Sequence, residues 1–359
     1  MTQFQIDEAA IPTTLDAADA ADFRAAIEVV GDVLTGIIGN REFVWTAAEE
    51  LPDWQNPLEP KRLWVARVEG RVAALAIYRP LPTEGTHTAE MEIDVLAEYR
   101  RRGIGSALLD ALVSAAENDG RTVLQTWALH PVPTGPALHS PTGFGTVPAD
   151  SDATRFLLGR GFRLGQVLRI SRLPLPVTAP DRDARLAEAG TAAGSAYRLL
   201  RWVGATPPEW QADMAMLRQR MSTDAPSGEM DAEEDEWTVE RLRAFDAAAE
   251  QSPRVTLTVV AEHMASGTLA GFTELTVPAE LDRPVDQGDT LVLREHRGHR
   301  LGMWMKAANL LFLEETHPGH PSVLTGNAEE NRPMLNVNEA LGFVPVAVEA
   351  AWQKTLTYR

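Results

Sequence analysis

A short pattern occurs twice in this chain, once in each half: an apolar strand segment, a basic turn that contains glycine, and an amphipathic helix. The first copy spans residues 91–112 and the second spans residues 288–309. After each turn, apolar residues recur every three or four positions, as they do on one face of a helix. A chain of 359 residues that repeats such a unit is expected to fold as two similar domains.

The basic turn is suited to hold a phosphate group. The first turn of a helix presents backbone N–H groups without internal partners, and the helix dipole adds partial positive charge there. In the first copy, Gly103 and Gly105 lack Cβ atoms, so a diphosphate could approach the backbone closely. The other polar side chains of the turn add positive charge and a hydroxyl group: Arg100, Arg101, Arg102 and Ser106. The alternative interpretation of each copy is a basic surface turn that starts an ordinary helix.

Both turns resemble the acyl-CoA loop of the GNAT family of N-acetyltransferases, whose pattern is Arg or Gln, two residues, Gly, one residue, then Gly or Ala, after a strand. Residues 100–105, Arg-Arg-Arg-Gly-Ile-Gly, fit this pattern. Residues 297–302, Arg-Gly-His-Arg-Leu-Gly, fit it except that Arg300 replaces the first glycine. Segments 156–162 and 331–343 are similar to the family's later helix and its Gly-Phe turn. The resemblance covers most of both halves, as in the tandem acetyltransferases of actinobacteria.

The resemblance implies an α/β (α+β) fold made of two tandem GNAT folds, each a mixed, mostly antiparallel twisted sheet flanked by helices. The expected order of elements in each half, strand, helices, four strands, helix and strand, agrees with this architecture. We expect an N-terminal domain at 1–175, a linker at 176–192 and a C-terminal domain at 193–359. The linker is expected because prolines, charged residues and alanines follow one another there.

Two further stretches have predicted structures. The segment 131–148 contains five prolines and is expected to be an irregular surface loop. Its length accounts for the only clear difference in spacing between the halves: 56 residues separate Gly105 from Gly161, whereas 40 separate Gly302 from Gly342. The acidic run 231–236 is expected to be the solvated start of a helix over 233–250 rather than a metal site.

Composition narrows the classes of function. The chain has no cysteine, which excludes disulfides, zinc-thiolate sites and a cysteine nucleophile. The net charge of −18 argues against a nucleic-acid partner and is compatible with a cationic amine substrate or with solubility alone. No apolar run approaches the ~20 residues of a membrane span, and Met1–Ala10 lacks a signal pattern, so we expect a cytoplasmic protein with no membrane partner. We also expect a monomer or homodimer that binds no metal.

The resemblance implies direct transfer of an acetyl group from acetyl-CoA to a small amine, without an acyl-enzyme. We expect the diphosphate on residues 100–106 and the pantetheine arm along the strand that ends at Val95, where a backbone N–H could hold the thioester oxygen. Val292 is the matching position in the second half. The predicted CoA-binding residues are Val95, Arg100, Arg101, Arg102, Gly103, Ile104, Gly105, Ser106, Val292, Arg297, Gly298, His299, Arg300, Leu301, Gly302 and Asn331.

The acceptor amine must lose a proton, and a strand carboxylate is the simplest base. Glu92 lies three residues before Val95, and Asp289 lies three residues before Val292, so these two are the predicted catalytic residues. Ordinary surface carboxylates are the alternative interpretation of both. Asp94 is a weaker candidate of the same kind, as is Glu90, and Glu274 is a candidate substrate contact.

The sequence departs from the family's pattern at the leaving group. The family often places a tyrosine, which protonates the departing thiolate, four residues before the Gly-Phe glycine. Those positions hold Leu157 and Asn338 here. Asn338 could donate a hydrogen bond to a thiol but could not protonate it. Asn331 has helix capping as an alternative to contact with the pantetheine arm.

Three hypotheses remain at the level of sequence. The first is an acetyl-CoA-dependent N-acetyltransferase. The second is a CoA-binding sensor or scaffold in which one or both folds do not turn over. The third is a division of labour in which one fold is structural. A dinucleotide-binding Rossmann unit is disfavoured, because no run combines Gly-x-Gly-x-x-Gly with a downstream acidic residue in a βαβ setting.

Overall fold

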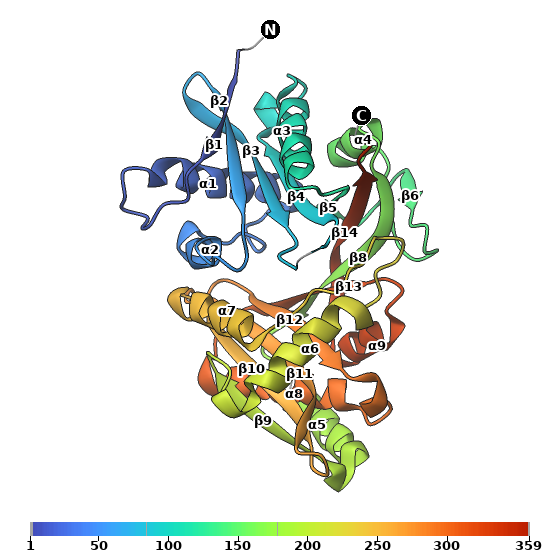
Figure 1. The fold of residues 1–359 in the computed structure, drawn as a ribbon. Coiled ribbons are helices and arrows are strands. Elements are labelled where there is room, and N and C mark those ends of the chain that lie inside the picture. Colours follow the sequence, from blue (N-terminus) through green and yellow to red (C-terminus); the bar gives the residue numbers. More distant parts are fainter. Residues whose placement is uncertain (1–2, 84, 178, 358–359) are drawn as a thin grey trace. The chain divides into compact units, whose positions relative to one another are not determined.

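The computed structural model describes residues 3–83, 85–177 and 179–357, and for residues 179–181 it describes the backbone alone. Contacts between Cα atoms divide the chain into two compact units, each built on a sheet with helices packed on it (Figure 1). The predicted class, two folds with mixed, mostly antiparallel sheets flanked by helices, is confirmed.

Unit 1 comprises Met1–Val167, Ser227–Glu233 and Ala347–Arg359. Its strands follow the order β1-β2-β3-β4-β5-β14-β8. The β4–β5 pair is parallel, whereas the β1–β2, β2–β3, β3–β4 and β5–β14 pairs are antiparallel. Its elements are β1 (Gln5–Ala9), α1 (Ala20–Ile38), α2 (Ala47–Trp54), β2 (Arg62–Val68), β3 (Arg71–Pro80), β4 (Thr88–Val95), η1 (Ala97–Tyr99), α3 (Ile104–Asn118), β5 (Val123–Pro131), β6 (Ala137–His139), β7 (Thr146–Pro148), α4 (Asp152–Gly159), the first part of β8 (Arg163–Pro174) and most of β14 (Val344–Thr355).

Unit 2 comprises Leu168–Pro226 and Glu234–Val346. Its strands follow the order β8-β13-β12-β11-β10-β9, in which only the β12–β13 pair is parallel. Besides the remainder of β8, its elements are α5 (Ala179–Ala193), η2 (Gly194–Ala196), β9 (Tyr197–Val203), η3 (Pro208–Trp210), α6 (Gln211–Asp224), α7 (Val239–Gln251), β10 (Val255–His263), β11 (Thr268–Val277), β12 (Val285–Val292), η4 (Arg294–His296), α8 (Leu301–Thr316), β13 (Ser322–Ala328) and α9 (Arg332–Leu341).

Alternating side chains of β3 give unit 1 two cores, one on each face of its sheet. Ala76 and Tyr78 belong to the core that contains α3, whereas Leu75 and Ile77 belong to the core that contains α1. This is the period of two that a strand covered on both faces requires. β14 completes the first of these cores with Trp352, which is fully buried. The N-terminal unit therefore depends on the last strand of the chain.

This division differs from the predicted boundaries at 175 and 193. Segments 227–233 and 347–359, both from the second half of the sequence, group with unit 1. The predicted linker 176–192 is helical from Ala179 onward, and α5 packs on α8 within unit 2. Thr178, inside that linker, lies outside the described residues.

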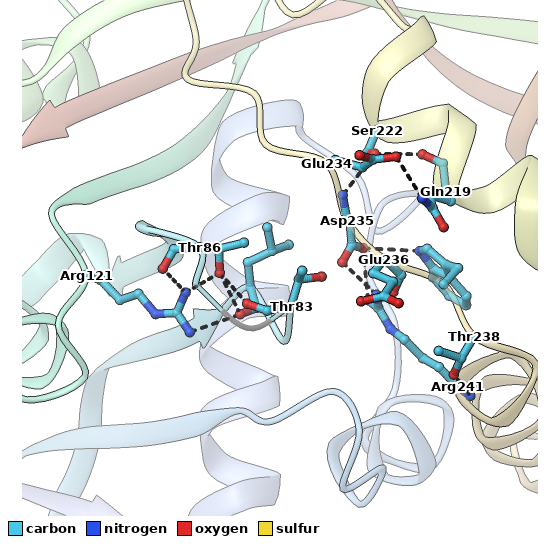
Figure 2. Close-up of polar contacts among 12 residues, drawn as sticks. Thr83, Thr86, Arg121, Gln219, Ser222, Glu234, Asp235, Glu236, Thr238 and Arg241 are labelled. Atoms are coloured by element: carbon cyan, nitrogen blue, oxygen red, sulfur yellow. Dashed lines mark hydrogen bonds and ion pairs between the residues drawn. The ribbon is translucent and has the colours of Figure 1, made fainter.

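The sequence led us to expect that the acidic run 231–236 starts a helix, and this prediction is wrong. The chain is without regular structure up to Thr238, whose side chain accepts a hydrogen bond from the Arg241 backbone N–H and so begins α7. Asp235 accepts hydrogen bonds from the Arg241 guanidinium at 2.6 and 2.9 Å and from the Trp237 indole at 3.1 Å (Figure 2). The acidic side chain is thus held by a local ion pair with Arg241 of α7 rather than by the dipole of a helix that it begins.

The proline-rich segment 131–148 also holds more structure than expected. Ala137–His139 and Thr146–Pro148 pair as a two-stranded antiparallel ribbon. Prolines are tolerated in such a ribbon because each strand needs N–H donors on one edge only. A second connection of unit 1, between β3 and β4, is fixed by Arg121, which donates hydrogen bonds to the backbone oxygens of Leu81 and Thr86 (Figure 2).

Candidate active site

The loop before α3 leaves the helix N-terminus uncovered. Gly103 is the N-cap residue, with φ of 88°, and no side chain caps the first turn. A Cβ atom built on Gly103 would meet nothing within 4 Å, so the surface over the first turn is open. Arg101 also has a positive φ, 62°, which is strained for a residue with a side chain. This geometry is suited to binding an anion on the N–H groups that begin α3, and such binding stays a prediction.

The arginines of this loop have distinct contacts. The Arg100 Nε donates a hydrogen bond of 3.0 Å to the Val95 carbonyl oxygen, which fixes the loop on the end of β4. Arg100 and Arg101 lie 3.3 and 3.8 Å from the half-exposed carboxylate of Asp152. Arg102 instead donates to the Glu98 carbonyl oxygen. The guanidinium groups of Arg100 and Arg101 therefore share one half-exposed counter-charge.

Strands β4 and β5 separate beside this loop. Their pairing covers Thr88 to Glu90 on β4 and Val123 to Gln125 on β5, and the described register ends there. The remaining part of β4, residues 91–95, keeps only its pairing with β3. The backbone groups of residues 91–95 on the β5 side are thus available to an extended ligand, which can add to the strand edge.

A cavity of about 820 Å³ occupies the gap between the strands. It is bordered by β4, the loop, the splayed end of β5, α4 and part of α1. Seven of the predicted CoA-binding residues line it: Val95, Arg100, Arg101, Gly103, Ile104, Gly105 and Ser106. Arg102 is not among the lining residues. The predicted base Glu92 lines the same cavity, so the predicted donor and acceptor residues of the first half meet in one site.

Glu92 belongs to a group of three carboxylates, Glu92, Asp94 and Glu349, which we call the acidic cluster. All three line the cavity. Burial raises the pKa of Asp94 well above its usual range, and the charge of Glu92 and a hydrogen bond with it raise it further. Burial raises the pKa of Glu349 to about 7, with a further contribution from Glu92. Arg79 donates a hydrogen bond of 3.4 Å to Glu92, and the charges of Arg100 and Arg79 partly oppose the rise in the pKa of Asp94.

The acidic cluster lies on one face of the sheet and the loop before α3 on the other. Met91, Ile93 and Val95 belong to the α3 core, so the alternate residues Glu92 and Asp94 point to the opposite face. Glu349 is directly opposite Leu129 in the β5–β14 register, between residues of β14 that belong to the α3 core. A ligand bound in the gap between β4 and β5 would therefore have the acidic cluster on one side and the loop before α3 on the other.

The position where the family often has a tyrosine also borders the cavity. Leu157 of α4 lines it, together with Phe156, whose ring would lie 3.6 Å from a Cβ built on Gly105. No hydroxyl group occupies this position. His130, at the end of β5, lines the cavity as well. Burial lowers the pKa of His130 to about 4, so its imidazole is neutral near pH 7.

The second loop, in unit 2, follows the same path with different chemistry. Arg300 is the N-cap of α8 with φ of 55°, Gly298 has φ of 88°, and the Arg297 Nε donates 3.1 Å to the Val292 carbonyl oxygen. Its arginines are paired with carboxylates of the same unit. Arg297 and Arg294 lie 3.1 and 3.2 Å from Asp224, whose side chain is only 6% exposed, and Arg300 pairs with Glu188.

The remaining predicted residues of the second copy lie around this loop and away from the unit 1 cavity. Leu301 is buried in the unit 2 core, and His299 is exposed and lies against the Tyr197 ring. A Cβ built on Gly302 would lie 3.9 Å from the Val292 side chain. Asn331 accepts a hydrogen bond of 3.4 Å from the Met334 N–H and caps α9, so its contact with a pantetheine arm stays a prediction.

The predicted base of the second copy sits in a different environment from Glu92. The register between β11 and β12 shifts at Asp289, which lies in a bulge. Its carboxylate is 3.9 Å from the buried Arg218, which also pairs with Glu274 at 2.8 Å. Burial raises the pKa of Asp289, and Arg218 opposes this. The Arg218 guanidinium stacks on aromatic rings, 4.4 Å from Phe245, so it is a fixed part of the unit 2 core.

Three residues of the unit 1 site were not predicted from the sequence: Glu349, His130 and Arg79. Glu349 is the single charged residue in the otherwise apolar run 344–352, which was a usable signal of function. His130 is level with Val95 once β4 and β5 are aligned in parallel, and this signal needs the sheet order. Arg79 lies near the end of the buried strand β3 and carried no signal of its own.

No helix of the described residues is long and apolar enough to cross a membrane. Within the same part of the chain, no group of three or more histidine or acidic residues could hold a metal ion. Nδ1 of His317 contacts the Thr316 hydroxyl, and Nδ1 of His320 contacts the Arg283 carbonyl oxygen.

Comparisons with known proteins bear on the fold and on the loop. Residues 38–134 match the sequence model of the acetyltransferase (GNAT) family. The chain is similar to a solved tandem GNAT protein from the clavulanic acid biosynthesis pathway, with 26% identity over 99% of this chain and 100% of that one and a TM-score of 0.74. No curated protein sequence matches it significantly.

Two more distant structures share the fold. A GCN5-related N-acetyltransferase from Sphaerobacter thermophilus is 13% identical over 98% of this chain and 95% of its own, with a TM-score of 0.61. A putative acetyltransferase from Pyrococcus horikoshii is 11% identical over 99% of this chain and 90% of its own, with a TM-score of 0.56. At these identities the likeness concerns the fold alone.

Proposed function

We propose that this tandem GNAT protein is an N-acetyltransferase in which unit 1 binds acetyl-CoA and transfers the acetyl group directly to a small amine. The tandem GNAT architecture predicted from the sequence is confirmed by the match of residues 38–134 to the family model and by the full-length likeness to a tandem GNAT structure. This likeness supports acyl transfer as the reaction class. The donor, the acceptor and the residues that serve them are our proposal.

The unit 1 loop fits the donor. The uncapped start of α3, the bare Gly103 and the guanidinium groups of Arg100 and Arg101 are suited to the diphosphate. The free edge of β4 up to Val95 is suited to the amide groups of the pantetheine arm. When bound there, acetyl-CoA supplies the activated acyl group.

The acidic cluster fits the acceptor. A cationic amine is attracted by Glu92 and Glu349 and must lose one proton before its lone pair can form the C–N bond. Glu349, with a pKa of about 7, is suited to accept that proton near neutral pH. Glu92, the base predicted from the sequence, is suited to orient the amine because Arg79 and Asp94 hold it in place.

One observation carries this proposal: a single cavity joins the anion-binding start of α3, the free edge of β4 and the acidic cluster. In unit 2, the arginines of the corresponding loop are paired with Asp224 and Glu188, which favours unit 1 as the acetyl-CoA site. This supports a division of labour between the two folds.

Thiol release tests the proposal. Purified protein is mixed with acetyl-CoA and a panel of small amines, and free CoA is measured over time at pH 8. We expect release that depends on both the amine and the protein, with a new amide detected by mass spectrometry. Tight acetyl-CoA binding without turnover on any amine would instead support the sensor or scaffold hypothesis.

A further inference from the structure

His130 has a buried nitrogen that no group of the protein satisfies. The residue is 2% exposed and lines the unit 1 cavity. Its Nε2 has no hydrogen-bond partner among the described residues. Buried polar atoms in proteins are nearly always paired, so an unpaired one calls for an explanation, such as a bound ligand or water. Because His130 lines the cavity, we infer that a bound ligand supplies the missing hydrogen-bond partner of its Nε2.

The register of the sheet places His130 beside the expected thioester. In the parallel β4–β5 pair, Thr88 is level with Val123, 35 positions later in the chain. Continuing this register along the splayed ends brings His130, also 35 positions later, level with Val95. Val95 is the residue whose backbone is expected to hold the thioester oxygen. His130 therefore lies across the gap from the reacting end of the donor.

His130 also lies on the donor's face of the sheet. It is directly opposite Val348 of β14, and directly opposite residues of an antiparallel pair share a face. Val348, Val95 and Leu157 all belong to the core beneath α3. The acidic cluster points to the other face. His130 is thus on the side of the leaving group, near the position where Leu157 replaces the family's tyrosine.

We propose that His130 donates a hydrogen bond from its Nε2–H to the CoA sulfur while the acyl group is transferred. The proposal rests on acetyl-CoA being bound in unit 1 as described above. The neutral amine, whose first proton has passed through the acidic cluster to water, forms the new C–N bond, and its nitrogen then gives a second proton to the acidic cluster. The C–S bond breaks, and its electron pair stays on sulfur. His130 stabilises that thiolate without giving up its proton, and the released thiolate takes a proton from water.

The imidazole acts in this role as a neutral hydrogen-bond donor. Burial keeps the pKa of His130 at about 4, so near pH 7 the ring carries one N–H and no charge. Hydrogen bonds to a charged acceptor are roughly twice as strong as neutral ones, so the contact strengthens as charge develops on sulfur. This makes His130 selective for the transition state over the bound thioester.

Nuclear magnetic resonance on the full chain tests the contact directly. The imidazole nitrogens of the eight histidines are labelled with ¹⁵N, and the His130 signals are assigned from the His130→Asn variant. CoA and desulfo-CoA, which lacks the sulfur, are then added in turn. We expect CoA to shift the Nε2 resonance of His130 and desulfo-CoA to leave it near its free value. Equal shifts with both ligands would overturn the proposal.

Steady-state kinetics provide a second readout. We expect His130→Leu to lower kcat roughly 10- to 100-fold, the effect of one lost hydrogen bond to a charged group, with little change in the KM for acetyl-CoA. His130→Asn, which keeps an N–H donor, should recover part of the loss. His139→Leu, on β6 and outside the cavity lining, is the matched control and should leave kcat unchanged. Equal losses in the Leu and Asn variants would contradict a hydrogen-bond role.

Calorimetric titration of CoA keeps this inference separate from the proposed function. If the wild-type protein binds no CoA, the proposed function fails and the inference fails with it. If CoA binds normally while the His130 resonance ignores the sulfur, the proposed function stands and only the role of His130 is rejected.

Discussion

The loops before α3 and α8 follow the same backbone path, but the arginine and the glycine that take positive φ angles occur in the opposite order. In unit 1 the positive φ angles fall on Arg101 and then on Gly103, whereas in unit 2 they fall on Gly298 and then on Arg300. Both loops follow a 3₁₀ turn, and both anchor an arginine Nε on the carbonyl oxygen of the last strand residue. The backbone path is thus the same in both loops, but the glycine occupies the second of the two positive-φ positions in unit 1 and the first in unit 2.

Because of this exchange, the unit 1 loop is suited to bind an external anion, whereas the arginines of the unit 2 loop pair with carboxylates of the protein itself. With glycine at the N-cap, the start of α3 is uncovered. With Arg300 at the N-cap, a side chain stands at the start of α8 and pairs with Glu188. The other unit 2 arginines share Asp224, which is buried, whereas the unit 1 arginines share Asp152, which is half exposed. A diphosphate would replace Asp152 more easily than Asp224, because an exposed ion pair is worth little.

The largest expected difference between the units concerns the base. We expect Glu349→Gln to lower kcat about 100- to 10,000-fold, the range for general-base catalysis, and to remove the rise of kcat with pH up to about 7. The sign follows because only the ionised carboxylate accepts a proton. Asp289→Asn in unit 2 should change kcat less than about threefold, since that carboxylate lies beside Arg218. Amide formation measured from pH 5.5 to 8.5 checks both variants, and a dominant effect of Asp289→Asn would reverse the assignment.

A smaller effect should follow from exchanging the two N-cap residues. Gly103→Arg makes the unit 1 loop similar to the unit 2 loop and should weaken acetyl-CoA binding about 10- to 100-fold, because a side chain then covers the helix start. Arg300→Gly makes the opposite change. It should leave the tight acetyl-CoA site unaltered and change the free energy of unfolding by less than about 1 kcal/mol, since relief of strain offsets loss of an exposed ion pair. Equilibrium binding and thermal unfolding measure the two quantities; weaker binding in Arg300→Gly would break the comparison.

The smallest expected effect is on stability. The pKa of Glu349 is raised to about 7 in the folded chain, so the folded state binds more protons than the unfolded state between about pH 4.5 and 7. Stability should therefore fall as pH rises through this window. Glu349→Gln removes the penalty and should be more stable than the wild type by about 1–3 kcal/mol at pH 8, with little difference near pH 4.5. Unfolding by urea at the two pH values tests this, and an equal difference at both would rule out the raised pKa as its cause.

Features that depend on local pattern could be predicted from the sequence. The two strand–loop–helix units and the loops around Gly103 and Gly302 follow from periodicity and from a short motif, and the mixed sheets follow from the family resemblance that the motif carries. Those signals survive because glycine positions and helix starts are set by neighbours in the chain.

Features that depend on distant pairing could not be predicted. The last strand joins unit 1 and brings Glu349 beside Glu92, and no local pattern specifies that neighbour. The run 231–236 misled helix prediction because Asp231 and Glu233, at its start, have partners far along the sequence. Glu233 accepts hydrogen bonds of 2.9 Å from the backbone N–H groups of His87 and Thr88, and this contact outweighs the helix preference of the run.

The central claim is that unit 1, and not unit 2, grips the diphosphate of acetyl-CoA on bare backbone amides. Isothermal titration of acetyl-CoA into the wild-type chain, Gly103→Glu and Gly302→Glu tests it most directly. We predict one tight site that Gly103→Glu weakens by at least about 100-fold, because a carboxylate then faces the diphosphate, and that Gly302→Glu leaves within about threefold. Tight binding that survives in Gly103→Glu and is lost in Gly302→Glu would contradict the account.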